Sequence, residues 1–208
     1  MNCTQNGAVS EVNIMSNTKK QTERLALGAL FTALVIILQL IGSAIRLGPF
    51  SISLVLVPIV LGAALCGYKI GGFLGLVFGA AVLISGDAGA FLAVDVFGTV
   101  LTVLAKGLCC GLAAGLVYKA LSRYNTYLAV IAAALVCPIV NTGVFLLGCL
   151  VFFMEALTQG GTALGFPNVG NYIIYGVVGG NFLVEMGINI VLAPAIIRVI
   201  NIVKKNKV

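Results

Sequence analysis

The chain has 208 residues, of which 61% are hydrophobic and only 9% are charged, and its formal net charge is +6. Soluble domains typically contain about 45–50% apolar and about 25% charged residues. This composition therefore excludes a soluble globular enzyme, a disordered protein and a nucleic-acid-binding protein. Histidine, the commonest general base and metal ligand, is absent. We infer an integral membrane protein that is not an enzyme, and we expect neither a cofactor nor a metal site.

The chain begins with a polar segment. Residues 1–23 precede the first apolar stretch, and we expect them to form a disordered tail. No cleavage site of small residues follows that stretch, so we expect no removable signal peptide. Residues 24–208 are strongly apolar and are predicted to form one transmembrane domain.

Six apolar segments follow the tail. They lie at about 25–45, 52–66, 70–85, 95–118, 127–154 and 171–200, and the second and third are short. A helix needs about 20 mostly apolar residues to cross a bilayer core of about 30 Å. The sequence therefore predicts an all-α, polytopic membrane protein with six transmembrane helices.

The basic residues predict the orientation, because Lys and Arg are retained in cytoplasmic loops. With the N-terminus inside, ten of the twelve lie on the inner side: Lys19, Lys20, Arg24, Lys69, Lys119, Arg123, Arg198, Lys204, Lys205 and Lys207. Arg46 then lies outside, and Lys106 lies within the fourth helix. Both termini, and the tail with them, are therefore predicted to be cytoplasmic. The loops at 46–51, 86–94 and 155–170 are then on the outer face.

Three helices in the C-terminal half each carry a polar stripe. The stripes consist of Asp95, Thr99, Thr102 and Lys106 in the fourth helix, Asn141, Phe145, Gly148, Phe152 and Glu155 in the fifth, and Asn181, Glu185 and Asn189 in the sixth. Spacings of three and four residues place each set on one helical face. Ionisable groups inside a membrane are costly and usually face a cavity or a partner. We therefore expect a polar pocket between these helices, below the outer loops.

Ten polar residues of these stripes and of the outer loops are the candidate substrate-binding residues. They are Arg46, Asp87, Asp95, Thr99, Thr102, Lys106, Asn141, Glu155, Asn181 and Glu185. A purely structural interpretation stays open beside this one. Lys106 and Glu185 could form a buried ion pair that sets the helix register, and the asparagines could hold helices together through hydrogen bonds.

Small residues recur at intervals of four in three of the helices. Glycines stand at 71, 75 and 79 in the third helix and at 107, 111 and 115 in the fourth. Ala29 and Ala33 form an AxxxA pair in the first helix. Such spacing lets helix backbones approach closely in lipid. We expect tight packing at the glycines, whereas the alanine pair suits either packing or a partner helix.

Three segments resemble those of a known family: ALGALFTALVIILQL in the first helix, LVPIVLGAALCGYKIGGFLGLVFG across the second and third, and GNFLVEMGINIVLAP in the sixth. They are similar to segments of the S component, the substrate-binding membrane subunit, of energy-coupling factor (ECF) transporters for vitamins. The second segment resembles the family's hairpin through Pro58, Gly62, Gly67, Lys69 and Gly71. The resemblance covers the chain from about Leu25 to its C-terminus.

The resemblance implies a transport function in the cell membrane. Such subunits bind a vitamin from outside and work with a transmembrane coupling subunit and two cytosolic ATPase subunits. This chain has no phosphate-binding loop with which to hydrolyse ATP itself. In that family the AxxxA face, here Ala29 and Ala33, contacts the coupling subunit, and the loop at 46–51 acts as a gate. Residues 24–208 would then be a six-helix substrate-binding domain.

The candidate residues leave the substrate open. Arg46 and Lys106 suit a carboxylate or a phosphate, whereas Asp87, Asp95 and Glu185 suit an amine or hydroxyl groups. Aromatic residues are few at the outer ends and tryptophan is absent, which disfavours a flat ring that needs stacking surface. The sequence therefore favours a pantothenate-like vitamin, followed by a riboflavin-like one.

Two other classes of protein remain as alternatives. A proton-coupled secondary transporter of a small metabolite would use Glu185 or Asp95 as its proton site. Its uptake would stop with an uncoupler and would continue without cytosolic ATPases. A membrane-embedded scaffold protein, by contrast, would bind no small molecule at all.

Overall fold

The computed structural model describes residues 3–44, 46–47, 50–51 and 54–205. Within these ranges the chain forms a bundle of helices with one small β-hairpin. The helices are α1 (Cys3–Ala44), α2 (Leu56–Cys66), α3 (Tyr68–Ser85), α4 (Gly89–Leu92), α5 (Val96–Leu121), α6 (Thr126–Phe152), α7 (Met154–Ala163), α8 (Val169–Asn171) and α9 (Gly179–Lys205), with the π-helical stretch η1 (Tyr172–Val178) before α9. Strands β1 (Arg46–Leu47) and β2 (Phe50–Ser51) pair antiparallel. The structure therefore has the predicted all-α character.

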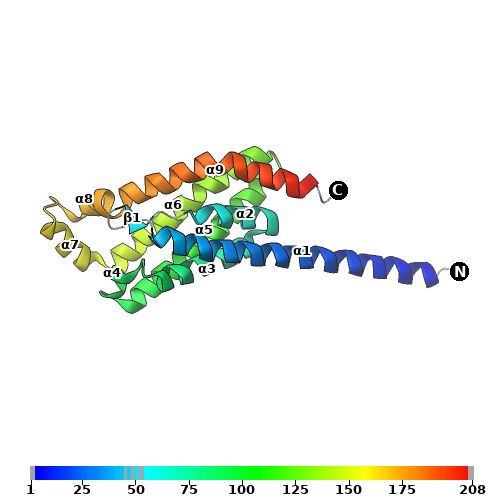
Figure 1. The fold of residues 1–208 in the computed structure, drawn as a ribbon, viewed down its shortest axis with the longest axis horizontal. Helices are drawn as coiled ribbons and strands as arrows, with labels where there is room; N and C mark the ends of the chain where they lie inside the picture. The colour runs from blue at the N-terminus through cyan, green and yellow to red at the C-terminus, as the bar shows by residue number, and fades with distance from the viewer. Residues whose placement is uncertain (1–2, 45, 48–49, 52–53, 206–208) are drawn as a thin grey trace.

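The long helices lie side by side, and both ends of the described chain lie at the same end of the molecule (Figure 1). The opposite end holds β1 and the short helices α4, α7 and α8. α1 continues beyond the other helices and forms a projecting arm.

Among the described residues, five segments are long and apolar enough to cross a membrane. They are Gln21–Ala44, Tyr68–Ser85, Val96–Leu121, Thr126–Phe152 and Val169–Val203. α2 is apolar too, but it has 11 residues. At 1.5 Å per residue it is roughly 16 Å long, about half the thickness of a bilayer core. Six transmembrane helices are predicted from the sequence, and five segments of spanning length are found among the described residues.

α1 runs through the segment for which the sequence predicts disorder. Residues 3–23 are helical and continue into the apolar part of α1 without a break. Residues 8–27 contain neither glycine nor proline, so a helix that is stabilised by its apolar half can propagate into the polar half. The predicted boundary at residue 23 therefore coincides with a change of composition and not with a change of secondary structure.

α3 and α5 pack backbone against backbone through their glycine repeats, as the spacing of four predicts. A Cβ atom added at Gly71 would lie 2.7 Å from the carbonyl oxygen of Gly111. Gly75 and Gly107 face each other even more closely. A side chain at these positions would push the two helices apart. The contact therefore determines how close α5 lies to α3 and in which direction the polar face of α5 points.

Two clusters of buried apolar side chains fill the bundle. The larger one joins α1, α2, α3, α5, α6 and α9 and includes Leu56, Ile59 and Leu74. The smaller one joins the end of α6 to α7 and η1 and includes Phe153 and Leu157. Members of both clusters line one cavity.

Candidate binding cavity

A cavity of about 340 Å³ lies between the two apolar clusters. Its lining comes from α1, α3, α4, α5, α6, α7, η1 and α9, so residues that are far apart in the sequence meet there. Small-molecule sites usually have volumes of about 300–1,000 Å³. The cavity therefore has the size of a site for one small molecule, toward the end of the bundle that holds α4 and α7.

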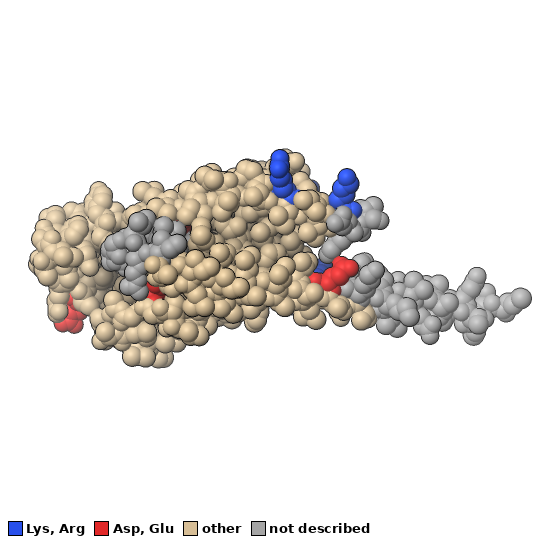
Figure 2. All heavy atoms as spheres, in the orientation of Figure 1, with Lys and Arg blue, Asp and Glu red and all other residues tan. Residues whose placement is uncertain are grey.

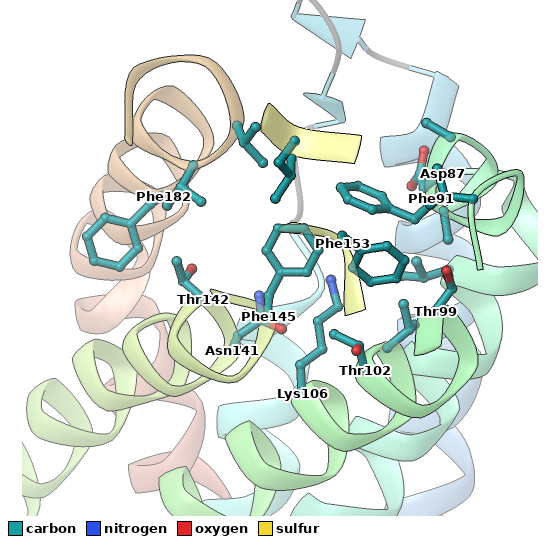
Figure 3. A pocket seen from close by; sticks show the side chains of 18 of the residues that line it. Asp87, Phe91, Thr99, Thr102, Lys106, Asn141, Thr142, Phe145, Phe153 and Phe182 are labelled. Carbon is teal, nitrogen blue, oxygen red and sulfur yellow. The ribbon is translucent and has the colours of Figure 1, made fainter. Parts of the chain in front are cut away.

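The polar face of α5 points into this cavity, as the spacing predicts. Thr99, Thr102 and Lys106 all line it. Lys106 rises from α5 into the middle of the space, with its amino group below the aromatic rings (Figure 3). Its Nζ lies 5.2 Å from the centre of the Phe145 ring and 5.7 Å from that of Phe78. A cation at such a distance from a ring face is attracted to its π-electrons, so the rings partly replace water around this half-buried ammonium group.

Two polar atoms of the lining lack hydrogen-bond partners among the described residues. They are Thr102 Oγ1 and Asn141 Oδ1, and both are buried. By contrast, Thr99 Oγ1 donates a hydrogen bond to the carbonyl oxygen of Asp95 at 2.6 Å. A buried polar atom without a partner costs about 1–3 kcal/mol. Such atoms therefore mark positions at which a bound molecule would add a hydrogen bond.

Gln39 of α1 lines the cavity and is absent from the sequence-based candidates. Its side chain is only 3% exposed. Its Nε2 donates a hydrogen bond to the Asp87 carboxylate at 2.6 Å and a longer one to Ser85 Oγ at 3.4 Å. These bonds tie α1 to the segment between α3 and α4 at the edge of the cavity. Gln39 could have been noticed in the sequence because it is an amide side chain within the mostly apolar part of the first helix.

Glu185 reaches the cavity from α9 and is 3% exposed. One turn further on, Asn189 Nδ2 donates a hydrogen bond to the Glu185 carbonyl oxygen at 2.9 Å. The charged residues in the described lining are Lys106, Asp87 and Glu185, one cation and two anions. No cluster of three or more His, Cys, Asp or Glu side chains suited to a metal ion occurs in the described part of the chain. The polar part of the described lining therefore consists of hydrogen-bonding groups and these three charged side chains.

Aromatic residues form much of the remaining lining. They are Phe78, Phe91, Phe145, Phe153, Tyr172 and Phe182. The ring centre of Phe91 lies 5.4 Å from that of Phe145 and 5.1 Å from that of Phe153, in edge-to-face arrangements. The expectation of few aromatic residues is based on the outer ends of the helices. It leaves out Phe78 and Phe145, which lie inside α3 and α6 and also line the cavity.

The structure brings six of the ten candidate residues to the cavity: Asp87, Thr99, Thr102, Lys106, Asn141 and Glu185. Asp95 and Glu155 are not part of its lining, because helix ends interrupt the predicted stripes. Asp95 precedes α5 in an extended conformation (φ −148°, ψ 111°). Phe153 (φ −123°, ψ 7°) separates α6 from α7, which carries Glu155. The side chains of Arg46 and Asn181 lie outside the described part of the structure.

Helices long enough to span a membrane, packed around a cavity with a mixed aromatic and polar lining, define an integral membrane protein with an internal cavity. Residues 23–197 match the family described as the substrate-specific component of ECF transporters. The match covers most of the chain, and the chain belongs to this family. It is accordingly a transport subunit of an ECF importer, not an enzyme, and it works with ECF coupling and ATPase subunits in the membrane. No curated protein and no solved structure matches the chain.

Proposed function

We propose that this subunit captures a small water-soluble vitamin, pantothenate-like or riboflavin-like, from outside the cell. It delivers the vitamin inward together with a coupling subunit and two cytosolic ATPase subunits. The observation that carries the proposal is the cavity of about 340 Å³, which gathers polar side chains from four long helices beside aromatic rings. Burying polar and charged groups inside a membrane bundle is costly, and a polar ligand offsets that cost.

Capture from outside is supported by the distribution of charge. The visible Lys and Arg side chains gather toward the end of the bundle where the C-terminus lies (Figure 2). Basic residues favour the cytoplasmic side of a membrane. The cavity lies toward the opposite end, so it faces outward when both termini are cytoplasmic. α2, although short, then serves as the second of six passes.

The surface for the coupling subunit is proposed to lie on α1. Ala29 and Ala33 are exposed, and so is the intervening Leu30, at 62%. Small residues four apart allow a second helix to approach the backbone closely in lipid. Gln39 on the same helix is buried at the cavity. α1 therefore presents one face to the cavity and another to the surroundings of the bundle.

A binding measurement tests the proposed capture of a vitamin. The full chain is purified in detergent, co-purified small molecules are identified by mass spectrometry, and a panel of vitamins is titrated by calorimetry. We expect one vitamin to bind and Lys106→Met to weaken its binding at least about tenfold, the loss of one charge-assisted hydrogen bond. Lys119→Met is the matched control, because Lys119 is an exposed lysine of the same helix. Absence of any bound or binding vitamin would contradict the proposal.

A co-purification experiment tests the partner surface. The double variant Ala29→Trp/Ala33→Trp is expected to lose the coupling and ATPase subunits while it still binds its vitamin, because two indole rings prevent close helix approach. The control is Ile139→Trp, an apolar site on α6 that is 49% exposed. Uptake that stops with an uncoupler and needs no ATPase subunits would instead indicate a proton-coupled transporter.

A further inference from the structure

We propose that the ligand of this cavity is an uncharged, flat heteroaromatic ring system whose edge presents neighbouring carbonyl and N–H groups. The inference rests on the proposed function and deepens it, because it selects between the two kinds of vitamin named above. It is carried by an aromatic wall, by unpaired polar atoms opposite that wall, and by the sign of the charges in the lining.

The aromatic wall consists of Phe91, Phe145 and Phe153. Phe91 meets Phe145 at an interplanar angle of 89° and Phe153 at 68°. The rings surround the space above Lys106 (Figure 3). Aromatic rings prefer offset-stacked or edge-to-face neighbours at centre distances of about 4.5–7 Å. A flat unsaturated ring satisfies that preference, whereas a flexible aliphatic acid gains only burial of its carbon atoms.

The polar groups below the wall specify the edge of the ring. Lys106 lies between Asn141 and Thr102 (Figure 3), and neither Asn141 Oδ1 nor Thr102 Oγ1 has a partner among the described residues. An ammonium group only donates, an amide oxygen only accepts, and a hydroxyl group does both. The ligand must therefore offer an acceptor to Lys106 and an N–H or O–H donor to Asn141. Adjacent C=O and N–H groups on a ring meet both needs at once.

The charges of the described lining disfavour an anionic ligand. One ammonium group, Lys106, stands with two carboxylates, Asp87 and Glu185. A phosphate or a carboxylate would be attracted by the first and repelled by the other two, and both effects are stronger in a protein interior than in bulk water. A neutral ring avoids this repulsion and still accepts a hydrogen bond from the ammonium group.

Four probes separate these features on the purified full chain. They are riboflavin, lumichrome (the same ring without the sugar-like chain), flavin mononucleotide (the ring with a phosphate) and pantothenate. We expect riboflavin and lumichrome to bind, and flavin mononucleotide and pantothenate to bind at least about tenfold more weakly. Calorimetry measures all four on one scale. Pantothenate binding more tightly than lumichrome, or flavin mononucleotide binding as tightly as riboflavin, would overturn the inference.

A variant pair tests the unpaired hydroxyl group. Thr102→Val keeps the shape of the side chain and removes Oγ1, so we expect lumichrome to bind about 3–10-fold more weakly. The melting temperature of the ligand-free protein should stay equal or rise, because a buried unpaired atom is lost. Thr32→Val is the control: Thr32 Oγ1 donates to the Gly28 carbonyl oxygen at 2.8 Å, away from the cavity. A lower melting temperature with unchanged affinity would assign Thr102 a structural role and contradict the inference.

The two proposals fail in different ways. If pantothenate or another vitamin binds tightly and no flat ring does, the ring inference is overturned and the proposed function stands. If neither mass spectrometry nor titration detects any ligand, both are contradicted. Binding of lumichrome together with its loss in Thr102→Val supports both.

Discussion

Gly71 offers a direct test of how α2, α3 and α5 are held together. A Cβ atom there would lie 2.7 Å from the Gly111 carbonyl oxygen and 2.6 Å from the Ala63 Cβ atom, whereas ordinary contact begins at 3.4 Å. In Gly71→Ala these two neighbours, which belong to two different helices, must therefore retreat by about 0.7–0.8 Å, as in other overpacked cores. Overpacking costs about 1–3 kcal/mol, which corresponds to a fall in melting temperature of about 2–12 °C for a chain of this size.

The assay follows the reaction of a thiol-reactive fluorescent dye during heating in detergent. It suits this chain because α2, α5 and α6 each contain a buried cysteine, which becomes accessible to the dye on unfolding. Gly187→Ala in α9 is the matched control, since a Cβ atom there meets nothing within 4 Å. This control substitution should leave the free energy of unfolding unchanged or raise it by about 0.4–1 kcal/mol. A Gly71→Ala protein as stable as Gly187→Ala would refute the close backbone contact.

Three further predictions concern α1 and α6. Gln39→Glu places a second carboxylate where Gln39 Nε2 now lies 2.6 Å from Asp87, and two adjacent carboxylates resist joint ionisation. As the pH rises from about 5 to about 8, the melting temperature of this variant should therefore fall relative to that of the native chain. Equal dependence of the two melting temperatures on pH would contradict this prediction. Asn125→Ala removes the cap of α6, whose Oδ1 accepts from Tyr127 N at 2.8 Å, and should cost about 1 kcal/mol, seen as a melting temperature lower by about 2–4 °C. Deletion of residues 3–20, which belong to the projecting N-terminal part of α1 (Figure 1), should leave vitamin affinity unchanged in a titration.

The polar face of α5 could be predicted because it depends on one helix alone. Thr99, Thr102 and Lys106 are three and four residues apart, and any regular helix through them places their side chains together. The glycine repeats are equally local: small residues every four positions give a smooth stripe whatever lies opposite. The structure confirms both patterns and shows that the stripe of α3 meets the stripe of α5.

The same reasoning fails where a helix ends. The spacing of Asp95 and Glu155 in the sequence fits their stripes. The extended backbone at Asp95 and the break at Phe153, however, mean that neither residue continues the regular helix that carries the rest of its stripe. Spacing carries information only as long as the helix continues. α4 contacts α5 and α7 contacts α6 near these ends, and periodicity does not report such contacts.

Membrane location, helical class and the inward-facing sides of single helices thus follow from composition and periodicity, because these properties depend on neighbours within about two turns of one chain segment. The aromatic wall and the bond from Gln39 to Asp87 do not follow from them. Phe91, Phe145 and Phe153 meet only because α4 folds against the C-terminal part of α6, and Gln39 meets Asp87 only because α1 lies beside the end of α3. Such contacts depend on which helices become neighbours, and tertiary packing alone decides that.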